Sequence, residues 1–262
     1  MRKITLKPIK VNKSKHEFAF YKEDISSIVS TLSPDSQLHI EDKNLCHRIE
    51  HILRLKPQEK FILFDRSENI LVKLKYTEKK KYIVATIVKK EQNRRLKPKI
   101  EFILPLLKKD NFKSALYSLV ELGAQVIQPV ITQKSQKIWK KQLIHSRYLN
   151  IIISAAEQSK NFAFPILKAP VNLDQYLSEN DNQSCIKIYF DPDGDLLWKK
   201  IEKIKSDNFD KIVLMVGPEG DLTQEEKKSI KQNNFIFCKL TPTVLRSFQA
   251  VTVGVGTLRS LL

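Results

Sequence analysis

The segment 211–221, KIVLMVGPEGD, places two of the chain's six glycines within four residues, directly after an apolar run. In open α/β sheets ligands bind at the carboxyl ends of strands, and a glycine there lets backbone N–H and C=O groups approach a ligand closely. A plain turn from strand to helix would need one glycine and no particular glutamate. We therefore interpret residues 217–220 as a ligand-binding loop.

A second loop of the same kind lies in 238–250, CKLTPTVLRSFQA, where a proline-bearing loop again joins a strand to a helix. Arg246 in this loop is one of nine arginines in a chain dominated by lysine. Its planar guanidinium offers a fork of donors that suits the carbonyl oxygens of a base or a phosphate. A structural arginine at a helix N-terminus would be unfavourable because of the helix dipole, which favours a functional role.

Other polar residues give weaker signals. Glu157 and Gln158 in AAEQSKNFAFP could orient a partner strand or a nucleotide, but by themselves they are typical of a solvated helix end. The five histidines are scattered, without metal-ligand spacing and without a nucleophile beside them, so no metal site is predicted. Gly254 and Gly256 are interpreted as sites of close helix packing.

Strands and helices that alternate from residue 100 onward must position these loops. Such alternation predicts an α/β fold with a mostly parallel sheet. The expected strands are 100–107, 125–131, 185–190, 211–216 and 235–240. The expected helices are 112–122, which ends at Gly123, then 139–159, a helix capped by Thr223 and Glu226, and 247–262 with one apolar stripe.

The part before residue 91 has a different pattern. Short runs rich in β-branched and aromatic residues predict strands at 61–64, 70–76 and 82–88, and apolar spacing predicts a helix over 44–55. The polar stretch EQNRRLKPK lacks apolar periodicity and contains a proline. We therefore divide the chain into a small β-rich domain at 1–90, a linker at 91–99 and an α/β domain at 100–262.

The charge of the chain is strongly positive and unevenly placed. Forty-six Lys and Arg face 29 Asp and Glu in 262 residues, a formal net charge of +17. The net charge is +12 over residues 1–100, +6 over 101–170 and −1 over 171–262. Biased codon usage would spread lysine evenly, so the concentration favours a polyanionic partner, most simply nucleic acid.

Composition also excludes several classes of protein. No three glycines fall within six positions, which excludes the dinucleotide fingerprint and the phosphate-binding P-loop. Cys46, Cys185 and Cys238 lack paired spacing, so neither a zinc site nor a disulfide framework is indicated. The basic start is followed by no apolar signal region, and no stretch is long enough to span a bilayer. We expect a cytoplasmic protein with no membrane partner.

Four motifs in order, LVELGA, AAEQS, LMVGPEG and LTPTVLRS, resemble the ribosomal RNA small subunit methyltransferase E family of the SPOUT superfamily. This family transfers a methyl group from S-adenosylmethionine to N3 of a uridine in 16S, small-subunit ribosomal RNA. The resemblance covers essentially the whole chain, and LCHRIEHILRLKPQEKFILFD looks like the family's N-terminal PUA-like RNA-binding domain. The GPEG loop with the following LRS loop is its most specific part.

The resemblance implies a deep trefoil knot in the C-terminal domain, a homodimer whose two-fold interface includes the last helix, S-adenosylmethionine as cofactor, and small-subunit ribosomal RNA or the 30S subunit as partner. It implies a donor pocket formed by Phe190, Gly217, Pro218, Glu219, Gly220, Leu240, Thr241, Val244 and Leu245. We assign Arg246 a catalytic role, stabilising negative charge on a uracil oxygen. The cations that we expect to bind RNA are Arg2, Arg48, Arg54, Arg94, Arg95 and Lys134.

Several positions depart from the family pattern. Asp221 stands where a second glycine is usual, Phe248 replaces a carboxylate, and Ser118 replaces a lysine. An Arg-Asn-Arg sequence reads Asn-Phe-Ala at 161–163. These changes leave two alternatives open: a non-catalytic RNA-binding or ribosome-assembly protein on the same scaffold, and the same methyl transfer to another RNA.

Overall fold

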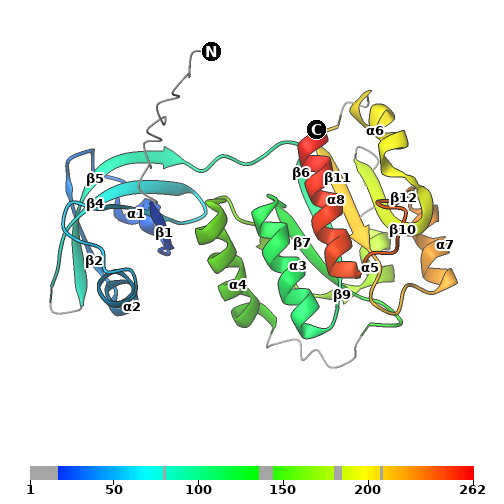
Figure 1. The fold of residues 1–262 in the computed structure, drawn as a ribbon, viewed down its shortest axis with the longest axis horizontal. Helices are drawn as coiled ribbons and strands as arrows, with labels where there is room; N and C mark the ends of the chain where they lie inside the picture. Colours follow the sequence, from blue (N-terminus) through cyan, green and yellow to red (C-terminus); the bar gives the residue numbers. More distant parts are fainter. Residues whose placement is uncertain (1–16, 79–80, 136–143, 180–184, 207–208) are drawn as a thin grey trace, which may run out of the picture.

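The structure is a computed structural model that describes residues 17–78, 81–135, 144–179, 185–206 and 209–262. It contains two separate sheets, a five-stranded one formed by the N-terminal part and a seven-stranded one formed by the C-terminal part (Figure 1). This arrangement confirms the predicted fold class, an α/β domain with a smaller β-rich domain. The knot stays a prediction.

The N-terminal sheet has the order β1-β3-β4-β5-β2, in which only the β1–β3 pair is parallel. Its strands are β1 (Phe18–Tyr21), β2 (Gln37–Glu41), β3 (Lys60–Phe64), β4 (Glu68–Glu78) and β5 (Tyr82–Gln92). The three strands predicted in this part are confirmed. Fully buried apolar side chains on one face form its core, among them Phe20, Phe61, Leu63, Ile70 and Ile83.

Short helices accompany this sheet: α1 (Ile25–Ile28), α2 (Lys43–His47) and the π-helix η1 (Arg48–Ile52). The single helix expected over 44–55 is therefore wrong in its extent. Asp42 caps α2 by accepting a hydrogen bond from Leu45 N. The α-helix is followed directly by the π-helix η1, which ends at Ile52. The apolar spacing is shared by both helix types, so it did not show the change between them.

All strand pairs in the C-terminal sheet are parallel, in the order β12-β10-β11-β6-β7-β8, with β9 also beside β7. Its strands are β6 (Lys99–Pro105), β7 (Val126–Ile131), β8 (Ile166–Leu167), β9 (Val171–Asn172), β10 (Ile186–Leu196), β11 (Lys211–Val216) and β12 (Ile236–Lys239). The five strands expected after residue 100 are confirmed.

Strand β10 is longer than the sequence predicted, because it continues beyond Phe190 with a register shift against β12. Gly194 permits the close approach: an added Cβ would lie 2.7 Å from Cys238 N. The polar run DPDGD carries no strand signal, so pairing with β12 overrides the local preference.

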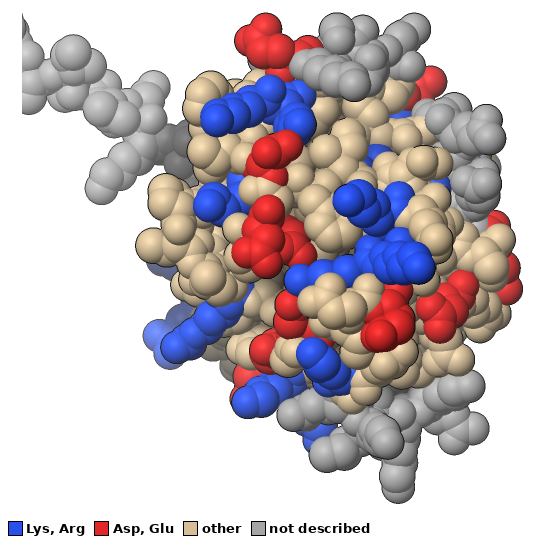
Figure 2. Space-filling view, turned by 90° about the vertical axis from the view of Figure 1, so that its right-hand side faces the viewer, with Lys and Arg blue, Asp and Glu red and all other residues tan. Residues whose placement is uncertain are grey.

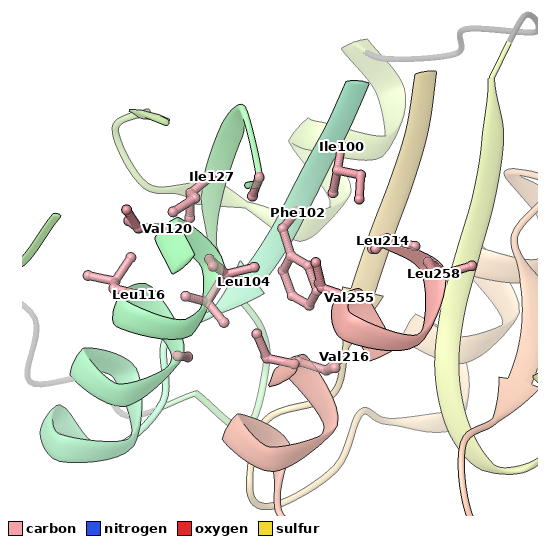
Figure 3. Packing of buried hydrophobic residues seen from close by; sticks show 14 of the residues in the cluster. Ile100, Phe102, Leu104, Leu116, Val120, Ile127, Leu214, Val216, Val255 and Leu258 are labelled. Carbon is pink, nitrogen blue, oxygen red and sulfur yellow. The ribbon is translucent and has the colours of Figure 1, made fainter. Parts of the chain in front are cut away.

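Helices cover both faces of the larger sheet: α3 (Lys109–Glu121), α4 (Ile144–Ser159), α5 (Leu173–Glu179), α6 (Leu197–Ser206), α7 (Gln224–Gln232) and α8 (Ser247–Leu261). Figure 1 shows α4, α3 and α8 side by side on one face. Phe102 and Leu104 of β6 point toward this layer, where they share one buried cluster with Leu116 of α3 and Val255 of α8 (Figure 3). Ile103 points to the opposite face, beneath α5 and α7.

The end of α3 at Gly123 and the capped start of α7 are confirmed, whereas α3 begins at Lys109, three residues before the predicted start. Gly123 follows α3 with φ +73°, the left-handed conformation that favours glycine. Thr223 and Glu226 form a complete capping box at the start of α7. Residues 139–143 of the expected helix 139–159 lie outside the described residues. The connection between β5 and β6 consists of residues 93–98.

Candidate functional site

At the carboxyl edge of the parallel sheet, the end of β11, the middle of β10 and the loop before α8 surround a cavity of about 610 Å³. In a parallel sheet this edge is where ligands bind. The lining residues come from four segments and are Lys108, Asn111, Tyr189, Phe190, Pro192, Val216, Gly217, Pro218, Glu219, Asp221, Val244, Leu245, Arg246, Ser247 and Ala250. The two loops that the sequence singled out are therefore brought together at one site.

Gly217 is packed closely against two side chains of the cavity. An added Cβ would lie 3.0 Å from the Tyr189 hydroxyl and 3.2 Å from Asp221 Oδ1. The loop backbone consequently stands bare at the cavity wall, where its polar groups can reach a ligand.

Glu219 ties the same loop to the start of α3. Its Oε1 accepts hydrogen bonds from Lys108 N at 2.9 Å and from Asn111 Nδ2 at 2.8 Å. The first N–H groups of a helix lack partners within the helix, and a carboxylate there also complements the helix dipole. Glu219 thus satisfies α3 and fixes the loop at once.

Asp221 ends the loop in the left-handed conformation, with φ +59°. Glycine favours this conformation, and aspartate tolerates it better than most residues. The side chain gains its own contacts, since Oδ1 accepts Leu222 N at 2.7 Å and Oδ2 lies 2.9 Å from Lys227 Nζ. The departure from the family pattern at this position therefore keeps the backbone shape and adds a charge.

Lys227 of α7 joins two of the cavity's loops. Its Nζ also lies 2.9 Å from Oδ2 of Asp191, a carboxylate that is 3% exposed. That contact has the distance but not the angles of a hydrogen bond, so it acts as an ion pair. Burial lowers the pKa of Lys227, but the two carboxylates outweigh burial and raise it.

These contacts also set the charge of Asp221 and Tyr189. Burial raises the pKa of Asp221, but the Lys227 ammonium and the Leu222 N–H lower it below its usual value. Burial and then the nearby Asp221 and Asp191 carboxylates raise the pKa of Tyr189 well above its usual value. The cavity wall therefore carries a fixed carboxylate beside a neutral phenol.

Phe190 forms an apolar part of the wall and rests against α8. An added Cβ on Gly254 would lie 2.4 Å from the Phe190 ring. The prediction that Gly254 permits close packing is confirmed. The side chain that packs against it is Phe190, which lines the cavity.

Arg246 stands at the N-cap position of α8, exposed and on the cavity lining. Among the described residues, no carboxylate lies within ion-pair distance of it. Lys108 lines the same cavity from the start of α3. An anionic group or a carbonyl oxygen in the cavity would therefore meet two cations.

The remaining residues predicted for the donor pocket lie beside this cavity, with one exception. Leu240 and Thr241 line a smaller cavity that shares Phe190 and Leu245 with the first. Gly220 lines neither cavity, and an added Cβ there would lie 3.5 Å from Lys134 Cβ.

The cations expected to bind RNA are dispersed. Arg54, Arg94 and Arg95 are exposed in the N-terminal part and the connection, and Lys134 lies exposed beside the GPEG loop. Arg2 lies outside the described residues. Arg48 of η1 instead donates from Nη1 and Nη2 to the Glu157 carboxylate of α4, at 2.9 and 2.6 Å, and so joins the N-terminal part to the C-terminal part.

Lys108, Asn111, Tyr189 and Lys227 are parts of this site that the sequence did not predict, whereas the resemblance placed Asp191 beside Phe190 at the end of the preceding strand. Tyr189 lies in an apolar strand and reads as core, and the others are single polar residues without a motif. The one signal in the sequence was Asp221, because a charged residue stands where the family usually has a glycine. In the structure this position has left-handed backbone.

The geometry is that of a ligand site at the carboxyl ends of parallel strands. Comparison with known proteins identifies the class of protein to which this site belongs. Residues 94–259 match the family model of the RNA methyltransferase domain. The chain belongs to the RNA methyltransferase family. The matched residues include every strand of the larger sheet and both loops of the cavity.

Individual members of the RNA methyltransferase family resemble this chain. Ribosomal RNA small subunit methyltransferase E of Rickettsia conorii is 24% identical over 168 residues, which cover 59% of this chain and 62% of that protein. The match thus spans less than two thirds of that relative's length. Ribosomal RNA small subunit methyltransferase E of Neisseria gonorrhoeae, crystallised with S-adenosylmethionine, is 25% identical, with a TM-score of 0.79 over 94% of this chain and 98% of that one.

A methyltransferase from Legionella pneumophila, solved in complex with the cofactor, shares the fold with a TM-score of 0.78 at 23% identity over 94% of this chain and 98% of that one. The resemblance that the four motifs indicated is therefore confirmed. In the described part of the chain, no helix has the length and apolar character to cross a membrane, and no cluster of His, Cys, Asp or Glu is arranged for a metal ion.

Proposed function

We propose that the chain transfers the methyl group of S-adenosylmethionine to N3 of a uridine in small-subunit ribosomal RNA. The carrying observation is the cavity formed by the GPEG and LRS loops, in a chain whose fold matches that of the Neisseria protein with a TM-score of 0.79 at 25% identity. That protein was crystallised with S-adenosylmethionine bound.

The residues present fit this donor. A volume of about 610 Å³ lies within the range of roughly 300–1,000 Å³ that is usual for small-molecule sites. Gly217 leaves the backbone bare, Phe190 and Val244 offer apolar surface, and Asp221 offers a carboxylate. The donor has no phosphate, so the missing P-loop is no obstacle.

Arg246 would act on the other substrate. When bound, S-adenosylmethionine supplies an electrophilic methyl group on its sulfonium. A bond from uracil N3 to this carbon forms as the sulfur–carbon bond breaks, and the N3 proton leaves to a base. Arg246 stabilises the negative charge that develops on a uracil oxygen, and Lys108 lies on the same lining. Most of the rate then comes from positioning.

Glu219 takes a positioning role, because its Oε1 already accepts two hydrogen bonds from the start of α3. Asp221 is held in its charged form by Lys227, which suits a binding contact better than proton abstraction.

We further propose a homodimer that uses the outer face of α8, in a cytoplasmic setting. Val251, Val255 and Leu258 are buried against the sheet, whereas Val253 and Leu261 on the same helix are 36% and 38% exposed. Exposed apolar residues on a helix suit a two-fold interface.

The test is transfer of labelled methyl from S-adenosylmethionine to small-subunit ribosomal RNA, with mass spectrometry of the nucleosides. We expect N3-methyluridine, and a loss of about 100- to 1,000-fold in kcat for Arg246→Ala, with unchanged donor affinity. Lys228→Ala on α7 is the matched control. Full transfer by Arg246→Ala would overturn its role.

Two further outcomes decide between the alternatives. Donor binding without transfer to any RNA would show a non-catalytic protein on this scaffold. Transfer to a different RNA would keep the chemistry and change the substrate.

A further inference from the structure

A second large cleft, of about 780 Å³, lies away from the donor cavity, between the two sheets. Its walls come from β4, from the end of β5 and the connection after it, and from the ends of α3 and α4 (Figure 1). The lining residues are Asn69, Glu91, Gln92, Asn93, Arg94, Leu96, Glu121, Ser159, Lys160, Asn161, Phe162 and Ala163.

Contacts between the two parts hold these walls in place. Glu157 binds Arg48 at 2.9 and 2.6 Å and also accepts Tyr21 N at 3.0 Å. The Phe162 ring packs on Phe64 with centroids 4.6 Å apart. The cleft is therefore a built feature of the whole molecule and not a gap between loosely tethered domains.

The cleft's lining offers three kinds of contact to a nucleic acid. Phe162 is half-buried and presents a ring in the cleft. Arg94 and Lys160 are exposed cations on opposite walls. Of the two carboxylates, Glu91 is paired with Lys89 at 2.6 Å.

Amide side chains supply the third kind of contact. Asn161 Nδ2 donates a hydrogen bond to Val120 O at 2.8 Å, which fixes the orientation of the amide group. Asn93 is likewise fixed, since its Nδ2 donates to Asp65 O at 2.7 Å and its Oδ1 accepts a hydrogen bond from Asn69 Nδ2 at 3.0 Å. Held amides of this kind can read the hydrogen-bonding edge of a base.

We propose that this cleft binds a single-stranded segment of the RNA substrate next to the target nucleotide, an inference that rests on the proposed function. Proteins bind single-stranded RNA in three ways: its bases stack on aromatic rings, the base edges form hydrogen bonds with the protein, and cations lie along the phosphate backbone. All three contacts are present here. The net charge of +18 over residues 1–170 favours a polyanion over a protein partner.

The position of the cleft agrees with this role. Helix α3 begins at the donor cavity, beside Lys108, and ends at the cleft, where Glu121 lines it. Thirteen helical residues span about 20 Å. One strand of RNA can therefore occupy both places when its target base is in the donor cavity.

The first test measures binding of a fluorescent 12-nucleotide oligouridine across a range of salt. Phe162→Leu keeps the apolar contact with Phe64 but removes the aromatic face, so affinity falls about tenfold and the salt dependence stays unchanged. Arg94→Gln weakens binding and lowers the slope of log Kd against log salt by about 0.7. The matched controls, Trp198→Leu on α6 and Lys228→Gln on α7, bind as the unaltered protein does.

The result that would overturn the proposal is wild-type affinity and slope in both cleft variants. Arg94 is exposed, so we expect Arg94→Gln to fold. If Phe162→Leu fails to fold, Arg94→Gln alone decides the test. Loss of binding to the assembled 30S subunit, with oligouridine binding intact, would make the cleft a protein-docking site and also overturn it.

A parallel measurement of methyl transfer separates this inference from the proposed function. Weaker oligouridine binding in the cleft variants of a protein that transfers no methyl would support the cleft and refute the chemistry. Normal transfer by both variants, with an unchanged KM for RNA, would support the chemistry and refute the cleft.

Discussion

At the scale of single residues, one ammonium group joins the parts of the donor cavity. Lys227 lies 2.9 Å from both Asp191, in the middle of β10, and Asp221, which ends the GPEG loop. Its side chain is 16% exposed and that of Asp191 is 2% exposed, so the ion pair with Asp191 is shielded from water and salt. This bridge could not be predicted from the sequence, because its members are separated by up to 36 positions and share no motif.

We expect Lys227→Met to weaken both stability and donor binding. It leaves the Asp191 carboxylate buried without its cation, which costs about 3 kcal/mol of unfolding free energy. Denaturant unfolding and donor calorimetry measure the two effects, and Lys228→Met, at an exposed neighbour, is the control. Adding Asp191→Asn to Lys227→Met should restore much of the stability. Unchanged stability and affinity in Lys227→Met would refute the bridge.

A second buried charge, Glu101 of β6, predicts a dependence of stability on pH. Burial raises its pKa, but Lys211 at 2.8 Å, Lys168 at 3.7 Å and the Tyr176 hydroxyl at 3.0 Å lower it below its usual value. A carboxyl whose pKa is lower in the folded state stabilises the fold above its unfolded pKa. That stability is lost as the pH falls through the folded pKa.

We therefore expect Glu101→Gln to cost about 2 kcal/mol at neutral pH, because Lys211 loses its partner. Below about pH 4.3 the difference from the unaltered protein should shrink. Urea unfolding at several pH values measures this, with Glu225→Gln on α7 as the exposed control. A difference that stayed constant with pH would contradict the assigned role of Glu101.

At the scale of elements, the sequence predicted strands β3 to β7 and β10 to β12, the capped helix ends and the two loops of the cavity, but not strands β1, β2, β8 and β9. Apolar runs, Gly123 and the capping box of α7 are local signals, and the structure confirms them. The unpredicted parts depend on contacts between distant segments. The extension of β10 needs β12 beside it, and η1 shares its apolar spacing with an α-helix.

The contact between α8 and the cavity wall gives the prediction at this scale. Gly254→Ala places a methyl group where the Phe190 ring now lies, 2.4 Å from the added Cβ. The ring must move, so donor affinity should fall about tenfold, which corresponds to a loss of about 1.4 kcal/mol of binding free energy. Donor calorimetry measures it.

Gly256→Ala is the matched control on the same helix, because its added Cβ would meet only Leu122 at an ordinary 3.8 Å. Equal donor affinity in the two variants would show that Phe190 has no part in binding.

At the scale of the whole molecule, the positive charge and the donor cavity belong to different parts of the chain. Residues 171–262, which hold the GPEG and LRS loops, have a net charge of −1. On the face that Figure 2 shows, cations and carboxylates are interspersed and form no single patch. The excess lies in residues 1–170, with a net charge of +18. Within this segment, Arg48 and Glu157 hold the N-terminal part against α4. The sequence showed this division of charge, but it could not show that Arg48 serves the joint between the parts, since its partner lies 109 positions away.

The measurement that tests the central claim most directly is calorimetric titration of S-adenosylmethionine into the unaltered protein and into Gly217→Val. We predict one donor bound per chain, and no binding by the variant, whose side chain would fill the space against Tyr189 and Asp221. Absence of binding by the unaltered protein at millimolar donor, or equal binding by both proteins, would contradict a donor site at these loops.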